Sequence, residues 1–75
     1  MERLFTTDLM INGRKATYEV IFENDAYVFH PQNPGADRPF SFKREEDEWH
    51  LQDNLEDGVR EAAIASLEKY LLSQH

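Results

Sequence analysis

The sequence predicts an α+β domain in which an antiparallel β-meander of four to five strands carries one C-terminal α-helix across one sheet face. Between residues 3 and 52, apolar and polar side chains alternate in short runs, and turn-forming sequences separate these runs. After residue 53 the spacing changes, and apolar residues recur at intervals of three and four, as on one face of a helix. We therefore interpret residues 1–75 as a single domain.

The first two strands are predicted over residues 3–11 and 14–23. Between them lies Asn12-Gly13, a frequent sequence for the type I′ turn, which requires positive φ at both central residues. A register that sets Ile11 opposite Arg14 gathers the apolar side chains of this hairpin on one face, and these are Phe5, Leu9, Ile11, Ala16, Tyr18, Val20 and Phe22. A shift of one residue would mix apolar and polar side chains on both faces.

Further strands are predicted over residues 26–30, 40–45 and 48–52. Asn24-Asp25 is expected to form the turn before the first of them, and Glu46-Asp47 the turn before the last. The resulting registers add more apolar side chains to the same face, namely Tyr27, Phe29, Phe40, Phe42, Trp49 and Leu51. The sheet thus has one aromatic side, which must be covered, as is usual when an antiparallel sheet buries one face.

The C-terminal helix is predicted over about residues 54–73. Two starts are open, because Asp53 can form a capping box with Glu56, whereas Gly58 weakens the first turns and favours a start at Asp57. The predicted apolar face comprises Leu55, Val59, Ala62, Ala63, Leu67, Tyr70 and Leu71, with Ile64 on its flank. This helix is the only cover available for the aromatic sheet face, so we expect the two to pack together.

Composition and charge narrow the possible functions. The chain has 75 residues, no cysteine and a formal charge of −7, so disulfides and thiolate metal sites are excluded. Between Arg44 and Glu61, eight acidic residues stand against two basic ones, a net charge of −6. Such a field repels phosphate backbones and anionic lipids and attracts basic protein segments. We therefore expect a protein partner, with a basic segment as one possibility, rather than nucleic acid.

The expected location is the cytoplasm, without a membrane span. No stretch approaches the roughly 20 apolar residues that a transmembrane helix needs. The first residues, Met1 to Phe5, contain charge within any apolar run and do not resemble a secretory signal.

No motif for catalysis or cofactor binding is present in the sequence. The histidines, His30, His50 and His75, lack the spacing of a metal site, and no glycine-rich phosphate loop or nucleophile elbow occurs. The carboxylates of the 45–48 turn are typical of a solvated turn rather than of an acid–base pair. The sequence therefore predicts a protein that is not an enzyme and holds no metal or cofactor.

Two surface features are the best candidates for contact with a partner. On the outer sheet face, Leu4, Ile21 and Val28 are expected to form an apolar strip in which Leu4 lies directly across from Ile21, with Met10 on the same face. The proline-rich loop over residues 31–39 is a stiff connection. Two polar residues, His30 and Arg38, could anchor a partner beside that loop.

The leading hypothesis is a small acidic binding or regulatory module that forms a homodimer through its outer sheet face or a sheet edge. One alternative is single-stranded nucleic-acid binding, since the predicted topology is similar in outline to the dimeric single-stranded-DNA-binding coactivator fold. That fold exposes aromatic and basic residues on its sheet, whereas the aromatic residues here point inward. A second alternative is a small enzyme that uses His30 and His50.

Overall fold

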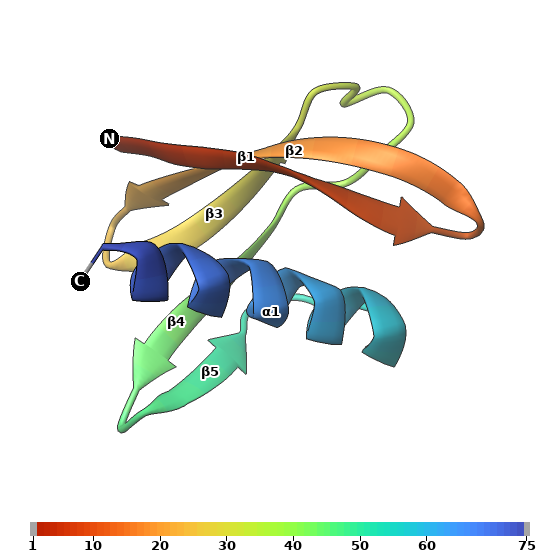
Figure 1. Cartoon of the computed structure of the whole chain (residues 1–75). Helices are drawn as coiled ribbons and strands as arrows, with labels where there is room; N and C mark the ends of the chain where they lie inside the picture. The colour runs from red at the N-terminus through yellow and green to blue at the C-terminus, as the bar shows by residue number, and fades with distance from the viewer. Residues whose placement is uncertain (1, 75) are drawn as a thin grey trace.

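The computed structural model describes residues 2–74 and shows a five-stranded sheet followed by one helix (Figure 1). The elements are β1 Glu2–Ile11, β2 Arg14–Glu23, β3 Ala26–Pro31, β4 Phe40–Glu45, β5 Glu48–Leu51 and α1 Asp57–Ser73. The strands lie in the order β1-β2-β3-β4-β5, and every neighbouring pair is antiparallel. The predicted α+β meander with a C-terminal helix is confirmed.

Three two-residue turns determine this topology. The residues of all three turns have positive φ, which are Asn12 (54°), Gly13 (76°), Asn24 (54°), Asp25 (61°), Glu46 (52°) and Asp47 (65°). Positive φ at both central positions is the signature of the type I′ turn, whose twist matches that of the flanking strands. Asparagine, aspartate and glycine tolerate this conformation, but Glu46 does so at a steric cost.

The register of the first hairpin agrees with the prediction from Ile11–Arg14 to Phe5–Val20 and then changes. Beyond that point Arg3 faces Ile21, and Phe22 is opposite Glu2. The expected pair of Leu4 with Ile21 is therefore wrong, and so is the pair of Arg3 with Phe22 that follows from the register with Ile11 opposite Arg14. The cause is a β-bulge, because β1 carries one residue more than β2 between Arg3 and Phe5.

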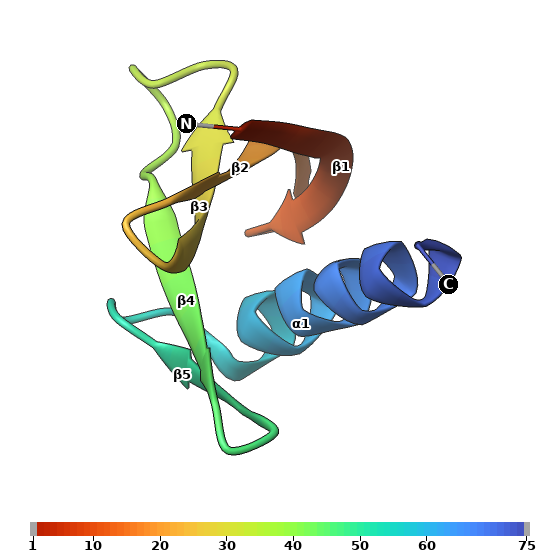
Figure 2. The same cartoon turned by 90° about the vertical axis from the view of Figure 1, so that its left-hand side faces the viewer.

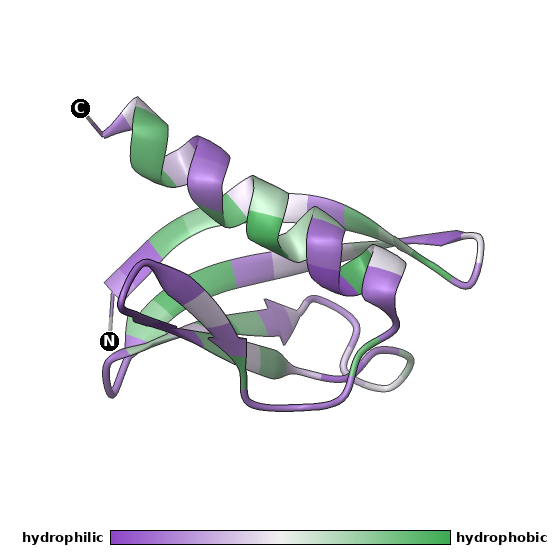
Figure 3. Ribbon diagram, turned by 90° about the horizontal axis from the view of Figure 1, so that it is seen from below, coloured by the Kyte–Doolittle hydropathy of each residue, from purple (hydrophilic) through white to green (hydrophobic). Residues whose placement is uncertain are grey.

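The core lies between the aromatic sheet face and α1. Figure 2 shows that the sheet is strongly curved, with β1 and β2 above α1 and with β4 and β5 to its side. In the view from below, α1 lies across the sheet (Figure 3). The buried core comprises Leu9, Ala16, Tyr18, Val20, Phe29, Phe40, Phe42, Val59, Ala63 and Leu67. Phe29 and Phe40 stack with ring centroids 4.7 Å apart, and fully burying such a side chain stabilises the fold by roughly 1.5–3 kcal/mol.

The helix begins at the later of the two predicted starts. Asp57 is its first residue, and Glu56 is the N-cap without a side-chain capping bond. Asp53 does not cap the helix, because its Oδ2 accepts a hydrogen bond from the Ser41 amide at 3.0 Å. Val59, Ala63 and Leu67 form the buried face. Ala62 is exposed, so its predicted place in the core is wrong.

We predict that replacing the 46–47 turn by Asn-Gly stabilises the fold. Glu46→Asn with Asp47→Gly places residues that favour positive φ at both positions and should raise the free energy of unfolding by about 1 kcal/mol. Urea denaturation measures this change. Glu46→Gln with Asp47→Asn removes the same two charges but keeps a side chain at both positions. An equal gain in this control would assign the effect to charge rather than to backbone conformation.

Candidate functional site

The predicted apolar strip on the outer sheet face is not continuous in the structure. Because of the bulge, Leu4 turns inward, where it packs against the core. Ile21 is buried, with 3% of its surface exposed, and its cross-strand neighbours are Arg3 and Val28. Met10 is 60% exposed and stands apart from this group along β1. The outer face therefore does not present Leu4, Ile21 and Val28 together to a partner.

The histidines lie apart. Strand β4 lies between β3, which carries His30, and β5, which carries His50. His50 pairs with Lys43 near the end of β4, whereas His30 lies beyond the β3 residue that pairs with Phe40 at the start of β4. Both side chains are exposed. His75 lies outside the described residues, and among residues 2–74 no group of three potential metal ligands occurs.

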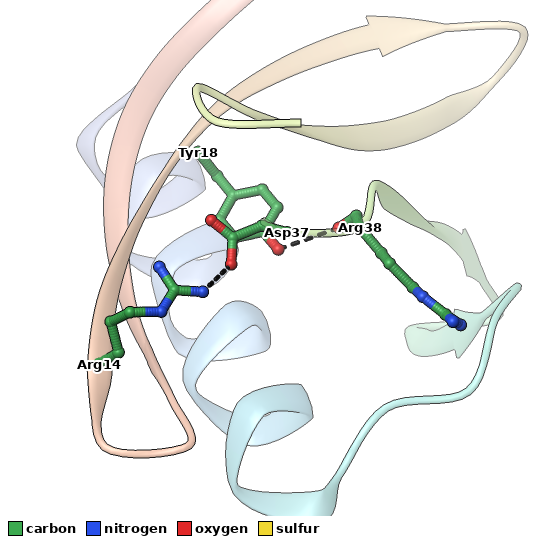
Figure 4. A network of polar contacts seen from close by, with 4 residues as sticks. All are labelled: Arg14, Tyr18, Asp37 and Arg38. Carbon is green, nitrogen blue, oxygen red and sulfur yellow. Dashed lines mark hydrogen bonds and ion pairs between the residues drawn. The ribbon is translucent and has the colours of Figure 1, made fainter. Parts of the chain in front are cut away.

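A polar cluster fixes the 31–39 loop to the sheet (Figure 4). The Asp37 side chain is 3% exposed, and its Oδ1 accepts a hydrogen bond from the Arg14 guanidinium at the end of the first hairpin. The Tyr18 hydroxyl donates to the backbone carbonyl of Arg38 at 2.9 Å. Arg14 and Asp37 are 23 residues apart in the sequence, so no local pattern indicated this pair. The predicted contact residue Arg38 thus binds the sheet through its backbone and keeps its side chain exposed.

Burial and neighbouring charges shift the pKa values of Tyr18 and Arg14 in this cluster. Burial raises the pKa of the Tyr18 hydroxyl, and the nearby Asp37 carboxylate raises it further. The bond with Asp37 raises the pKa of Arg14, which stays protonated. A pocket of about 280 Å³ adjoins the cluster and is also lined by the apolar side chains of Ile11, Leu55 and Val59. Since the charged groups of the cluster bind one another, we interpret it as a structural clamp on the loop.

The two edges of the sheet differ in their protection against strand pairing. At one edge, β5 has only four residues and follows an acidic turn, both of which discourage pairing. At the other edge, β1 has ten residues without lysine or proline, and from Phe5 to Ile11 its only charge is Asp8. Long, weakly charged edges are templates for an additional strand. The sequence alone favours the outer face as the contact surface and does not distinguish the two edges, because it does not specify the strand order.

The register identifies which backbone groups of β1 are free. Ile11 and Arg14 flank a two-residue turn and therefore form a hydrogen-bonded pair. Alternate residues of β1 bond to β2 from there on. It follows that Thr6, Asp8 and Met10 direct their N–H and C=O groups to the open edge.

A groove between β1 and α1 lies beside this edge. Its volume is about 300 Å³, and its lining residues are Phe5, Thr6, Thr7, Ser66, Lys69, Tyr70 and Ser73. Two of these lining residues, Phe5 and Tyr70, stack with ring centroids 4.9 Å apart, so part of the groove surface is aromatic. On the helix side, Ser66 and Ser73 are small, and they leave room for side chains of an added strand.

No protein-family model, curated protein or solved structure matches this chain. Function is therefore inferred from the geometry of the chain itself. Among residues 2–74, no helix is long and apolar enough to cross a membrane.

We predict that Arg14→Ala lowers the urea concentration at the midpoint of unfolding, because the buried Asp37 carboxylate loses its charged hydrogen-bond donor. The loss of stability is smaller than for a fully buried ion pair, because water reaches the half-exposed Arg14 side chain. Urea denaturation at neutral pH measures the change. Lys15→Ala is the matched control, since Lys15 is exposed and makes no ion pair among the described residues. Equal stability of the two variants would contradict the clamp.

We also predict that the contribution of Tyr18 to stability decreases at high pH. The unfolded chain releases the Tyr18 proton near the ordinary pKa of 10, but the folded chain retains it to higher pH. Stability from this group is therefore complete below that value and is lost as pH rises through the folded pKa. The stability difference between the natural protein and Tyr18→Phe should therefore be constant below the ordinary pKa of about 10 and shrink as pH rises above it. A difference that is independent of pH would refute the assignment.

Proposed function

We propose that this chain is a non-enzymatic protein-binding module, and that its partner adds an extended strand to the free edge of β1. The observation that carries the proposal is the contrast between the two sheet edges. β1 is long and carries one charge from Phe5 to Ile11, whereas β5 is short and flanked by acids. An unprotected edge of this length is a hazard for a soluble protein unless a partner uses it.

The groove beside β1 supports side-chain recognition. In strand addition, backbone hydrogen bonds supply affinity, and pockets for alternate side chains supply specificity. Thr6, Asp8 and Met10 offer the backbone groups. Side chains of the added strand that point inward would meet the groove over Phe5 and Tyr70. The site therefore has both parts that this mode of binding needs.

The arrangement of the cations favours a protein partner over nucleic acid. Phosphate recognition needs basic side chains that are free to contact the backbone. Arg14 binds Asp37, and the Arg44 guanidinium lies 4.6 Å from the centre of the Trp49 ring. These two arginines are engaged within the chain, and the formal charge of −7 adds a repulsive field.

Selection from a displayed library of random peptides tests the proposal. Peptides that bind the protein should adopt an extended conformation, and amide chemical shifts should change most on β1 and on the facing side of α1. Thr6→Pro removes one outward N–H and places a ring at the free edge, so it should abolish peptide binding.

Thr6→Val is the matched control, because it keeps the backbone donor and a β-branched side chain, and it should bind as the natural protein does. Circular dichroism verifies that both variants are folded. Selected peptides that shift the amides around Asp37 or on the outer face, and that still bind Thr6→Pro, would refute the edge as the binding site.

A further inference from the structure

We infer that the strand added to β1 is the β1 strand of a second copy of this chain, paired antiparallel about a two-fold axis at Thr6. This inference rests on the proposed function, because it names the occupant of the same edge. The result would be a continuous ten-stranded sheet with β1 at its centre. Closed symmetric pairing of this kind uses the same patch on both subunits.

The charges of β1 select the register of this pairing. Centring the axis on Thr6 brings Asp8 of each copy toward Arg3 of the other. An axis at Asp8 would instead set two carboxylates against each other, which is destabilising across strands. An axis at Thr7 would leave Asp8 opposite Thr6 of the second copy, without a charged partner. The Thr6 register is therefore the one that gives electrostatic complementarity.

The β-bulge makes this complementarity possible. In a regular strand, Leu4 would occupy the outer-face position two places before Thr6. Because the bulge turns Leu4 toward the core, Arg3 takes that outer position opposite Ile21. Asp8 lies on the same outer face, where its Oδ1 accepts a hydrogen bond from Thr17 and its second oxygen can accept another. The Arg3 side chain is 76% exposed and binds Glu19 of its own chain at 2.8 Å, so Asp8 of the second copy would be a further acceptor for the same guanidinium, which has five N–H donors.

On the inner sheet face, the groove between β1 and α1 has room for the side chains that this pairing brings together. Thr7 lies opposite Phe5 of the second copy in this register, so an aromatic ring from each copy enters the region between the two helices. Ser66 and the exposed Ala62 are small, and they allow this approach. Phe5 is only half-buried in the isolated chain, and the pairing would bury it further.

The distribution of acids also permits two copies to meet at β1. The acidic turn over residues 45–48 joins β4 and β5, which lie at the opposite edge of the sheet (Figure 2). β1 itself carries two acids and one base, Glu2, Asp8 and Arg3. A 75-residue chain without disulfides also gains stability from burying more apolar surface through self-association.

Sedimentation velocity over a dilution series tests the inference with the whole chain. The natural protein and Thr6→Val should form a dimer, and Thr6→Pro should be a folded monomer. Asp8→Arg should weaken the dimer on the order of tenfold, because symmetry places two like-charge contacts in the interface. Adding Arg3→Asp to Asp8→Arg should restore the dimer to within about threefold of the natural affinity.

The control variant is Lys43→Glu, an equally large charge change at an exposed position of β4 far from the free edge, and it should leave the dimer unchanged. A natural protein that stays monomeric at all concentrations, while selected peptides bind β1, would overturn the second copy as occupant and leave the proposed function standing. A dimer that persists in Thr6→Pro would overturn this inference, and peptide binding that persists in the same variant would overturn the proposed function. If Asp8→Arg with Arg3→Asp dimerises no more tightly than Asp8→Arg alone, the Thr6 register is overturned.

Discussion

Burial of one aromatic sheet face beneath a single helix is the constraint on which the rest of this structure depends. The chain has no disulfide to support it, so the rings of Tyr18, Phe29 and Phe42 must be excluded from water almost completely. One helix can cover five strands only because the sheet curves around it (Figure 2). The strand order of the meander places β1 and β5 at the two edges of this curved sheet.

The bulge in β1 is a small irregularity with large effects. It supplies one extra residue, so that Leu4 turns to the core and Arg3 to the outer face. The outer apolar strip thereby loses one member, and the free edge acquires a cation at the position where pairing with Asp8 needs one. Bulges usually occur where a strand must redirect a particular side chain or must stop pairing with its neighbour. This bulge redirects the side chains of Leu4 and Arg3.

The clamp on the 31–39 loop and the free edge of β1 differ in whether their polar groups are already hydrogen-bonded within the chain. Arg14, Tyr18 and Asp37 bind one another or the loop backbone, so the 31–39 loop is held in one place. At the other side of the first hairpin, the backbone groups of Thr6 and Asp8 have no partner strand among residues 2–74. A rigid support beside an unsatisfied edge is the arrangement that pre-organised strand addition requires, because little ordering entropy is then lost on binding.

Local sequence determined the turns, the inner and outer faces of most strands, and the buried stripe Val59, Ala63 and Leu67, since each follows from a short-range period or a turn dipeptide. Only the tertiary structure decided the bulge at Leu4, the outward position of Ala62 and the pairing of Arg14 with Asp37. These depend on how a curved sheet meets one helix and on contacts far apart along the chain. The candidate site at the β1 edge also depends on the tertiary structure. Strand order decides which strands lie at the edges of the sheet, and the residues of β1 alone do not specify that order.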